Sequence, residues 1–227
     1  LMELGPRATG KTYMYRHISY YTRIISGGRI SPAVLFYNIA TKTLGEIGIR
    51  DCVVFDEISK VSFSDPGEMM GKLKDYMESG FFERGPKKGV ATCSLVFMGN
   101  VDVRGQTPIE DFTYYLPDFM KDTAFIDRIH GFTPGWELPK VKQAEVHLSK
   151  NYGFVTDYFS EIMHELAKKN FHPYVNENAE LSGDLTIRDE KAVKRLAAGM
   201  LKLLCPNGKF SEEELGMCLD IAIKYRQ

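Results

Sequence analysis

The sequence predicts an α/β fold with a central parallel sheet, followed by a smaller all-helical part. Residues 52–55 and 94–98 are short, wholly apolar runs, the pattern of strands that are buried on both faces of a parallel sheet. Helical spacing of apolar residues is found instead in three later stretches, 155–170, 189–205 and 212–225. This change of period predicts an α/β domain over 1–139 and a helical lid domain over 140–227.

Turn residues and capping signals delimit the other elements expected in the first half. Asp65 and Pro66 are favoured at a helix N-cap and first turn, so a helix is expected from there to Ser79, before Gly80. The other expected elements are the end of a strand at 1–4, a helix at 12–26 stopped by Gly27 and Gly28, a strand at 33–37, and small hairpins at 41–50 and 81–92.

Composition indicates a soluble globular protein. The 227 residues are 44% hydrophobic and 26% charged, which is enough apolar material for a full core. A formal net charge of -1 gives no whole-molecule attraction to nucleic acid, although a local basic patch remains open. No apolar run is long enough to cross a membrane and no signal peptide is visible, so we expect a cytoplasmic protein.

The cysteines do not predict a metal centre. None of the four forms a C-x-x-C pair, and no histidine cluster accompanies them. Reduced thiols in a cytosolic interior are the expected state. Because a functional motif begins already at Gly5 and Leu1 is not an initiator Met, we expect a fragment of a longer protein.

A phosphate-binding loop is predicted near the start of the chain. The pattern G-x-x-x-x-G-K-[ST] is matched in full by Gly5, Pro6, Arg7, Ala8, Thr9, Gly10, Lys11 and Thr12. Glycines let backbone amides wrap phosphate oxygens, and the following helix directs its N-terminus at the same anions. Lys11 is expected to contact the β- and γ-phosphates of ATP, and Thr12 to place a hydroxyl on Mg²⁺. A chance match is the alternative, but the strand before and the helix after favour a real loop.

An acidic pair at a strand end indicates which kind of P-loop enzyme this is. Asp56 and Glu57 follow the apolar run 52–55. Asp56 is expected to hold Mg²⁺, and Glu57 to polarise the water that attacks the γ-phosphate. A small-molecule kinase has no use for such a base, since its nucleophile is a substrate hydroxyl. The pair therefore predicts an ATPase, with an ordinary solvated Asp-Glu pair as the alternative.

Three further polar residues are candidates for catalysis. Asn100 follows an apolar strand, where its amide can orient the attacking water, although Gly-Asn is also a common turn. Arg128 ends the α/β half, a position typical of an arginine that enters a neighbouring subunit's site; an ion pair with Asp127 is the alternative. Arg188 opens a helix of the second half and could reach the γ-phosphate from the lid, with Arg195 as competitor and plain solvation as the alternative.

These motifs, in this order, resemble the AAA+ superfamily of P-loop ATPases. More specifically, the chain resembles the BrxL family, the Lon-related AAA+ proteins of BREX phage-defence systems, over nearly its whole length. The phrases that carry the resemblance are LFYN (35–38), VVFDEI (53–58), LKDYMESGFFERG (73–85), LVFMGN (95–100), FIDRIHGFTPGWELP (125–139) and RDEKAVKRLAAGMLKLLCP (188–206). The phrase with DRIHG and PGWE is distinctive.

The resemblance implies a ring-forming ATPase that uses ATP and Mg²⁺. The residues that match the family's nucleotide site are Lys11, Thr12, Asp56, Glu57 and Asn100. Arg128 matches its arginine finger, and the expected partner is a second copy of the chain, in a hexamer when full length. Full-length members also carry an N-terminal region and a C-terminal Lon-like domain, neither of which is expected here, and no serine-lysine protease dyad can be assigned.

The resemblance also bears on what passes through such a ring. The helix and hairpin before the second apolar run resemble the element that MCM-like motors insert there, and the expected hairpin tip contains Arg84, Lys87 and Lys88. Six such tips would line a pore with positive charge suited to DNA phosphates, although a solvated turn is the plain alternative. A Lon-type protein unfoldase is the competing function, for which Phe81 and Phe82 keep an aromatic pore element open.

Overall fold

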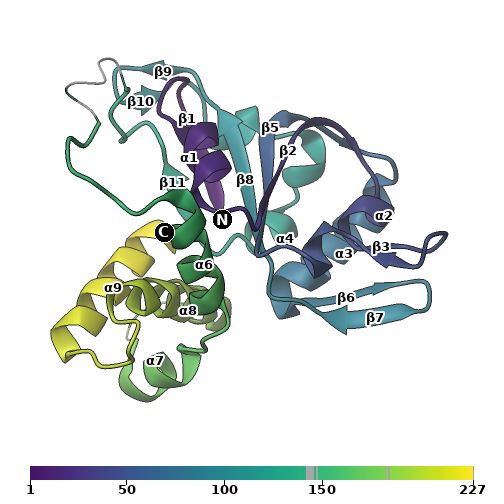
Figure 1. Cartoon of the computed structure of the whole chain (residues 1–227). Helices are drawn as coiled ribbons and strands as arrows, with labels where there is room; N and C mark the ends of the chain where they lie inside the picture. Colours follow the sequence, from purple (N-terminus) through teal and green to yellow (C-terminus); the bar gives the residue numbers. More distant parts are fainter. Residues whose placement is uncertain (142–145, 147, 182, 184, 227) are drawn as a thin grey trace.

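In the computed structural model, five strands form a central sheet (Figure 1). The structure describes residues 1–141, 146, 148–181, 183 and 185–226. In spatial order the strands are β11 (Phe132–Pro134), β1 (Met2–Gly5), β8 (Ser94–Asn100), β5 (Cys52–Phe63) and β2 (Thr22–Ile30). Every neighbouring pair runs parallel. The predicted α/β fold with a central parallel sheet is therefore confirmed.

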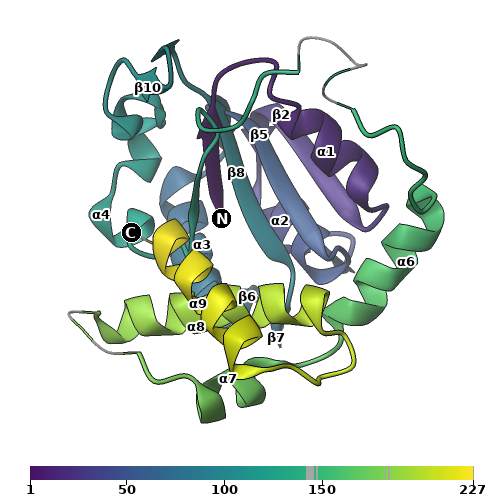
Figure 2. The ribbon, with the colours of Figure 1, turned by 90° about the vertical axis from the view of Figure 1, so that its left-hand side faces the viewer.

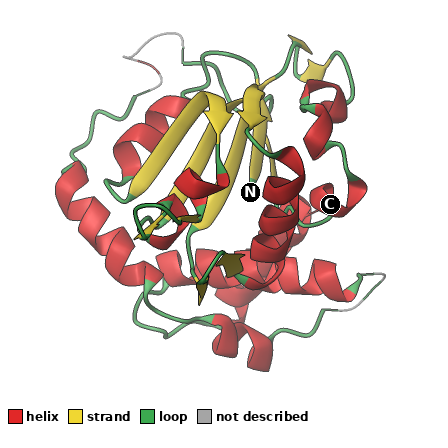
Figure 3. Cartoon of the chain, turned by 90° about the vertical axis from the view of Figure 1, so that its right-hand side faces the viewer, coloured by secondary structure: helices red, strands yellow, loops and turns green. Residues whose placement is uncertain are grey.

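Helices cover both faces of this sheet (Figure 2; helices red and strands yellow in Figure 3). On one face lies α1 (Lys11–Ile18), whose Tyr15 packs against Val54, Val96 and Met98 of the sheet. The other face carries α2 (Pro32–Leu35), α3 (Pro66–Ser79) and α4 (Thr123–Ile126). These helices share the larger core with apolar strand residues such as Phe55 and Phe97, whose rings stack 5.1 Å apart. The helix expected from Asp65 to Ser79 is confirmed, with Asp65 capping it.

Short hairpins and turns extend from the edges of the sheet. The hairpins are β3 (Tyr37–Asn38) with β4 (Thr43–Leu44), β6 (Phe81–Arg84) with β7 (Lys87–Val90), and β9 (Val103–Arg104) with β10 (Thr107–Pro108). The 3-10 turns are η1 (Glu46–Gly48), η2 (Phe112–Tyr115) and η3 (Asp118–Met120). The predicted hairpin at 81–92 is confirmed. The one predicted at 41–50 is shifted, because its strands span 37–44 and η1 follows.

The second half of the chain is helical where it is described. It contains α6 (Thr156–Ala167), α7 (His172–Asn178), α8 (Ile187–Leu204) and α9 (Glu212–Arg226), and no strand among its described residues. The last three helices form a separate apolar cluster and lie beyond the amino ends of the strands (Figure 1). The three predicted helices are thus confirmed. Within the described ranges, none of the helices is long and apolar enough to span a membrane.

Two predicted elements are wrong. Instead of one helix over 12–26, α1 ends at Ile18 and the chain turns into the edge strand β2. Pairing with β5 determines this outcome, and Gly27 and Gly28 adopt left-handed φ angles at a bulge of β2. Instead of a strand over 33–37, the chain forms α2. The Ser31 hydroxyl accepts a hydrogen bond from the Val34 N–H, and Pro32 occupies the first turn.

A close approach of two glycines positions the loop that follows β1. The Gly135 N–H donates to the Leu4 carbonyl at 2.7 Å. A Cβ on Gly135 would lie 3.0 Å from both Gly5 Cα and the Leu4 carbonyl oxygen. The segment after β11 therefore touches the end of β1 backbone to backbone, which a larger residue would prevent.

Gly135→Ala is expected to destabilise the fold and to displace the end of β1. Overpacking of this kind costs about 1–3 kcal/mol, and each kcal/mol lowers Tm by roughly 2–4 °C in a chain of this size. The matched control is Gly199→Ala in α8, an exposed position where a Cβ meets no atom within 4 Å. That change is expected to stabilise by about 1 kcal/mol through helix propensity. Equal melting temperatures for both variants would contradict this steric interpretation.

Candidate functional site

The predicted phosphate loop joins the carboxyl end of β1 to the first turn of α1. β1 ends at Gly5, and α1 begins at Lys11. Within the loop, Ala8 and Gly10 have left-handed φ angles of 68° and 82°. Turns of this kind direct successive backbone N–H groups into a concave anion-binding surface. The backbone is thus consistent with the phosphate-binding role that the pattern predicts.

The Lys11 ammonium is held within the loop. Its Nζ donates to the carbonyl oxygens of Gly5 at 3.0 Å and Pro6 at 2.8 Å. The residue is buried, with 8% of its surface exposed. Burial lowers the pKa of the amine, and the carboxylates of Glu3 and Asp56 oppose this shift. The Lys11 ammonium therefore lies within the loop, and the neighbouring carboxylates help to keep it protonated.

The two predicted metal ligands lie together. The Thr12 hydroxyl, in the first turn of α1, donates to Asp56 Oδ2 of β5 at 3.0 Å. One hydroxyl and one carboxylate are hard oxygen donors of the type that Mg²⁺ accepts alongside water and phosphate oxygens. Thr12, the last residue of the predicted loop, and Asp56 therefore fit a Mg²⁺ site.

Glu57 lies beside Asp56 in an unusual backbone conformation. Its φ of 51° is in the left-handed region, and its N–H donates to Asp56 Oδ1 at 2.9 Å. The Glu57 carboxylate pairs with Lys60 Nζ at 2.9 Å. The sequence predicted that the strand ends before this acidic pair, which is wrong, because β5 continues to Phe63. The left-handed residue interrupts the regular alternation of side chains at this point of the strand.

A cavity of about 360 Å³ brings several of these residues together. It is lined by Pro6, Arg7, Glu57, Ser59, Lys60, Asn100, Val101, Asp102, Val103 and Lys140. Asn100 is the last residue of β8 and pairs in register with Gly5. The parallel register thus places the Asn100 amide, which is predicted to orient the attacking water, next to both the loop and the acidic pair.

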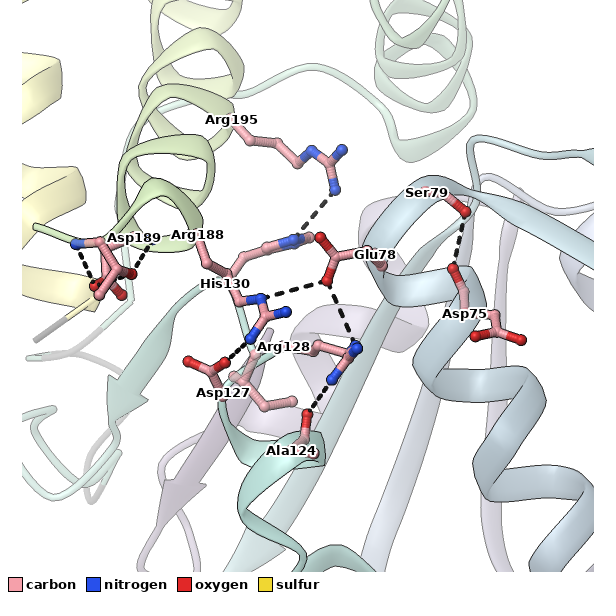
Figure 4. A network of polar contacts seen from close by, with 12 residues as sticks. Asp75, Glu78, Ser79, Ala124, Asp127, Arg128, His130, Arg188, Asp189 and Arg195 are labelled. Atoms are coloured by element: carbon pink, nitrogen blue, oxygen red, sulfur yellow. Dashed lines mark hydrogen bonds and ion pairs between the residues drawn. The ribbon is translucent and has the colours of Figure 1, made fainter.

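The predicted arginines lie elsewhere, in one polar cluster (Figure 4). Arg128 Nε and Arg188 Nε approach the same oxygen, Glu78 Oε2, at 3.5 and 3.3 Å. Arg188 also pairs with Asp127. Arg195 contacts the His130 ring at 3.2 Å. Burial, with help from the Arg195 cation, lowers the pKa of His130 to about 3, so this ring is neutral and can accept a hydrogen bond from the Arg195 guanidinium.

This cluster lies at the amino ends of the parallel strands, whereas the phosphate loop lies at their carboxyl ends. The Met2 N–H donates to the Gly131 carbonyl at the amino end of β1, just after Arg128 in the chain. Since the strands are parallel, the loop after β1 lies at the other edge. Arg226 fastens the helical part here, donating to Asp189 Oδ1 at 2.7 Å and to the Ile129 carbonyl at 2.5 Å. In the described part of the chain, Arg188 pairs with Glu78 and Asp127 and does not contact the phosphate loop of its own chain.

The cations of the β6–β7 hairpin are partly engaged. Arg84 donates to the Tyr37 carbonyl at 2.6 Å and faces Glu68 at 3.5 Å. Lys88 pairs with Glu83 at 3.0 Å, on the exposed surface. Among the described residues, Lys87 has no ion pair. The structure therefore turns one of the three predicted tip cations inward and leaves the two lysines exposed.

Several residues near these sites were not found from the sequence. They are Glu3, Lys60, Glu78 and Arg226. Lys60 and Glu78 sit in segments of ordinary charged sequence, with no motif to single them out. Glu3 is a charge inside an otherwise apolar strand, which is a signal that could have identified it.

The fold and the loop define the chain as an α/β P-loop ATPase domain. The model of one family, described as "Lon-like protease BrxL-like, ATPase domain", matches residues 1–227. The chain belongs to this family. The resemblance stated from the sequence motifs is thereby confirmed.

Two curated proteins called "Lon-like protease BrxL" are similar to the chain over nearly all of it. The one from Escherichia coli O9:H4 (strain HS) is 39% identical over an alignment of 229 residues that covers 99% of this chain and 32% of the relative. The one from Bacillus cereus (strain H3081.97) is 38% identical over 226 residues, 98% of this chain and 33% of the relative. The chain thus spans about a third of the length of the relatives it matches.

Lys11→Ala is expected to weaken ATP binding by about 100-fold, because charge-assisted hydrogen bonds contribute about 1.5–3 kcal/mol each and the ammonium makes more than one. The measurement is titration calorimetry with ATP and Mg²⁺. The control is Lys209→Ala, which removes an equal charge from an exposed loop. Near-normal affinity in the Lys11 variant would rule out the phosphate-loop assignment.

Proposed function

We propose that this chain is the ATP-binding and ATP-hydrolysing core of a ring-forming AAA+ motor. The observation that carries the proposal is the contact of Thr12 with Asp56, next to a cavity that Glu57 and Asn100 line. These are the parts that phosphoryl transfer to water needs: a metal site, a base and a donor that orients the water. The products would be ADP and phosphate.

Each residue has a role that its position supports. Lys11 would exchange its loop carbonyls for the β- and γ-phosphates, and Thr12 and Asp56 would hold Mg²⁺, which when bound neutralises phosphate charge. Glu57 would accept the proton of the attacking water, for which it must part from Lys60. Asn100 would orient that water through its amide.

The arginines support a site shared between chains. Arg128 and Arg188 lie at the edge of the sheet opposite their own loop, side by side on Glu78. We propose that this edge meets the loop of a neighbouring copy in a ring, a hexamer when full length, where both guanidiniums would approach the transferred phosphate. Arg195, which contacts neutral His130, is the competing candidate for the second arginine.

We propose DNA as the material on which the ring acts, in phage defence and in the cytoplasm. Exposed Lys87 and Lys88 at the hairpin tip support contact with phosphates. The competing proposal is a protein unfoldase, as the name "Lon-like protease" of the relatives suggests. An aromatic pore element is poorly supported, because Phe82 is buried at 4% exposure and Phe81 stands at the base of the hairpin.

Glu57→Gln and Arg128→Ala test the shared site. Each variant alone is expected to hydrolyse ATP at least about 100-fold more slowly, since a missing base or finger costs on that order. Mixed, they are expected to regain part of the activity, because an interface between an Arg128→Ala subunit and a Glu57→Gln subunit can combine an intact base with an intact arginine. The measurement is turnover per subunit against protein concentration at several mixing ratios.

The control for this mixing is Glu57→Gln with Lys11→Ala, two changes in the same half of the proposed shared site. Interfaces between these variants always lack one part of the loop side, so no recovery is expected. Absence of recovery with Arg128→Ala at every ratio would contradict an arginine acting between chains. Unchanged turnover in Glu57→Gln would remove it as the base.

Replacing Lys87 and Lys88 with Glu tests DNA contact. Binding to duplex DNA is expected to weaken, and the slope of log affinity against log salt to fall by about 2, one for each lost phosphate contact. The control replaces Lys150 and Lys209 with Glu, which changes net charge equally on exposed segments elsewhere. An unaltered slope in the hairpin variant excludes the tip from the DNA interface.

A further inference from the structure

Glu3 is a buried carboxyl beneath the phosphate loop that none of the proposed catalytic roles uses. It lies in β1, two residues before Gly5, and only 4% of its surface is exposed. A carboxylate removed from water is costly unless charged or hydrogen-bonding groups surround it. Its neighbours therefore indicate what it does.

The strand geometry directs Glu3 toward α1. Side chains alternate along β1, and Met2 and Leu4 belong to the core on the opposite face. The register partner of Glu3 in β8 is Met98, which packs with Tyr15 of α1 between helix and sheet. Glu3 thus shares a face of the sheet with the helix that begins at the phosphate loop.

Two residues of α1 meet this carboxyl. Lys11 and Tyr15 are one helical turn apart and so lie on one side of α1. The Lys11 cation and the Tyr15 hydroxyl both act on the Glu3 carboxyl, the hydroxyl as a hydrogen-bond donor. Burial raises the pKa of Glu3, while the Lys11 cation and the Tyr15 hydroxyl lower it. Burial and the Glu3 charge raise the pKa of Tyr15, so its hydroxyl stays a donor.

Two side chains of β5 also act on members of this trio. The Asp56 carboxylate acts on Lys11, and the Cys52 thiol acts on Tyr15. On the far side of β1, the register partner of Glu3 is Thr133 of β11, which has no charge. Glu3 is therefore, with Asp56, one of two carboxylates of the sheet that act on the Lys11 ammonium, and it is the one with no proposed role as a metal ligand.

We propose that Glu3, oriented by Tyr15, is a positioning residue that holds the Lys11 ammonium down on the loop carbonyls and thereby weakens nucleotide binding. To contact phosphates, Lys11 must leave the carbonyl oxygens of Gly5 and Pro6. An ionised Glu3 stabilises the Lys11 ammonium on these carbonyls and repels the phosphates. The carboxylate thus lowers affinity for product and speeds its release. This inference rests on the proposed function of the loop.

Glu3→Gln tests the inference, since it keeps size and hydrogen bonding and removes the charge. The affinity for ADP with Mg²⁺ at pH 8, measured by calorimetry, is expected to rise about tenfold, from one unit charge near the phosphates at a moderate dielectric. Release of ADP should slow by a similar factor. The control is Glu213→Gln, an exposed carboxyl of α9, which should change neither quantity.

The pH profile distinguishes this role from a structural one. Below its raised pKa, Glu3 is neutral and resembles Gln, so the wild-type affinity should approach that of Glu3→Gln as pH falls. Titration of the nucleotide itself is common to both proteins and cancels in the ratio. Tyr15→Phe removes a hydrogen bond that lowers the pKa of Glu3. The pH at which the two affinities converge should therefore move upward in that variant.

Two results overturn the inference in different ways. If wild-type protein binds ADP and Glu3→Gln binds it equally at every pH, Glu3 does not act on the nucleotide, even if Tm changes. If wild-type protein binds no ADP at all, the proposed function of the loop fails together with the inference.

Discussion

β1 pairs with β8 on one side and with β11 on the other, in parallel register throughout. This short strand is buried along its whole length, and its two ends determine where the functional residues lie. At the carboxyl end, pairing places Gly5 beside Asn100, and the Leu4 carbonyl accepts the Gly135 N–H. At the amino end, Met2 is hydrogen-bonded to Gly131, next to the arginine cluster. A shift of one residue in the register of β1 would turn Glu3 toward the larger core that holds Met2 and Leu4, and would displace the phosphate loop.

The same pairing separates two halves of one proposed reaction centre. Phosphate loop, acidic pair and sensor amide lie at one edge of the sheet, and both arginines lie at the other, where Glu78 holds them. A rigid parallel sheet cannot bring its two edges together. In the proposed ring, the arginines that stabilise the transferred phosphate would come from another copy, and turnover would depend on assembly. The fastening of α9 to this edge through Arg226 keeps the helical part in place there.

Local signals predicted most of the sheet and the loop, because they depend on few neighbours. The phosphate loop, the apolar strands and the capped helix α3 each follow from residue type and spacing alone. The two elements assigned to the wrong type lie where tertiary pairing or a single cap decides between helix and strand. Residues 22–30 have the composition of either, and only the partner strand β5 selects extended structure. At 33–37 the residue types favour a strand, but the cap formed by Ser31 and Pro32 begins the helix α2.

The placement of the charges was least predictable, since it depends on the fold as a whole. The sequence predicts Arg84 at the hairpin tip, yet its side chain turns inward and donates to the Tyr37 carbonyl of the neighbouring hairpin. Glu3 interrupts an apolar strand in a place where a leucine would avoid the cost of burying a carboxyl. A charge at such a position is stabilised by Lys11 and Tyr15, and it in turn acts on Lys11. A loop that bound nucleotide as tightly as possible would release product slowly, so a buried opposing charge is a physical means of limiting affinity without changing the loop itself.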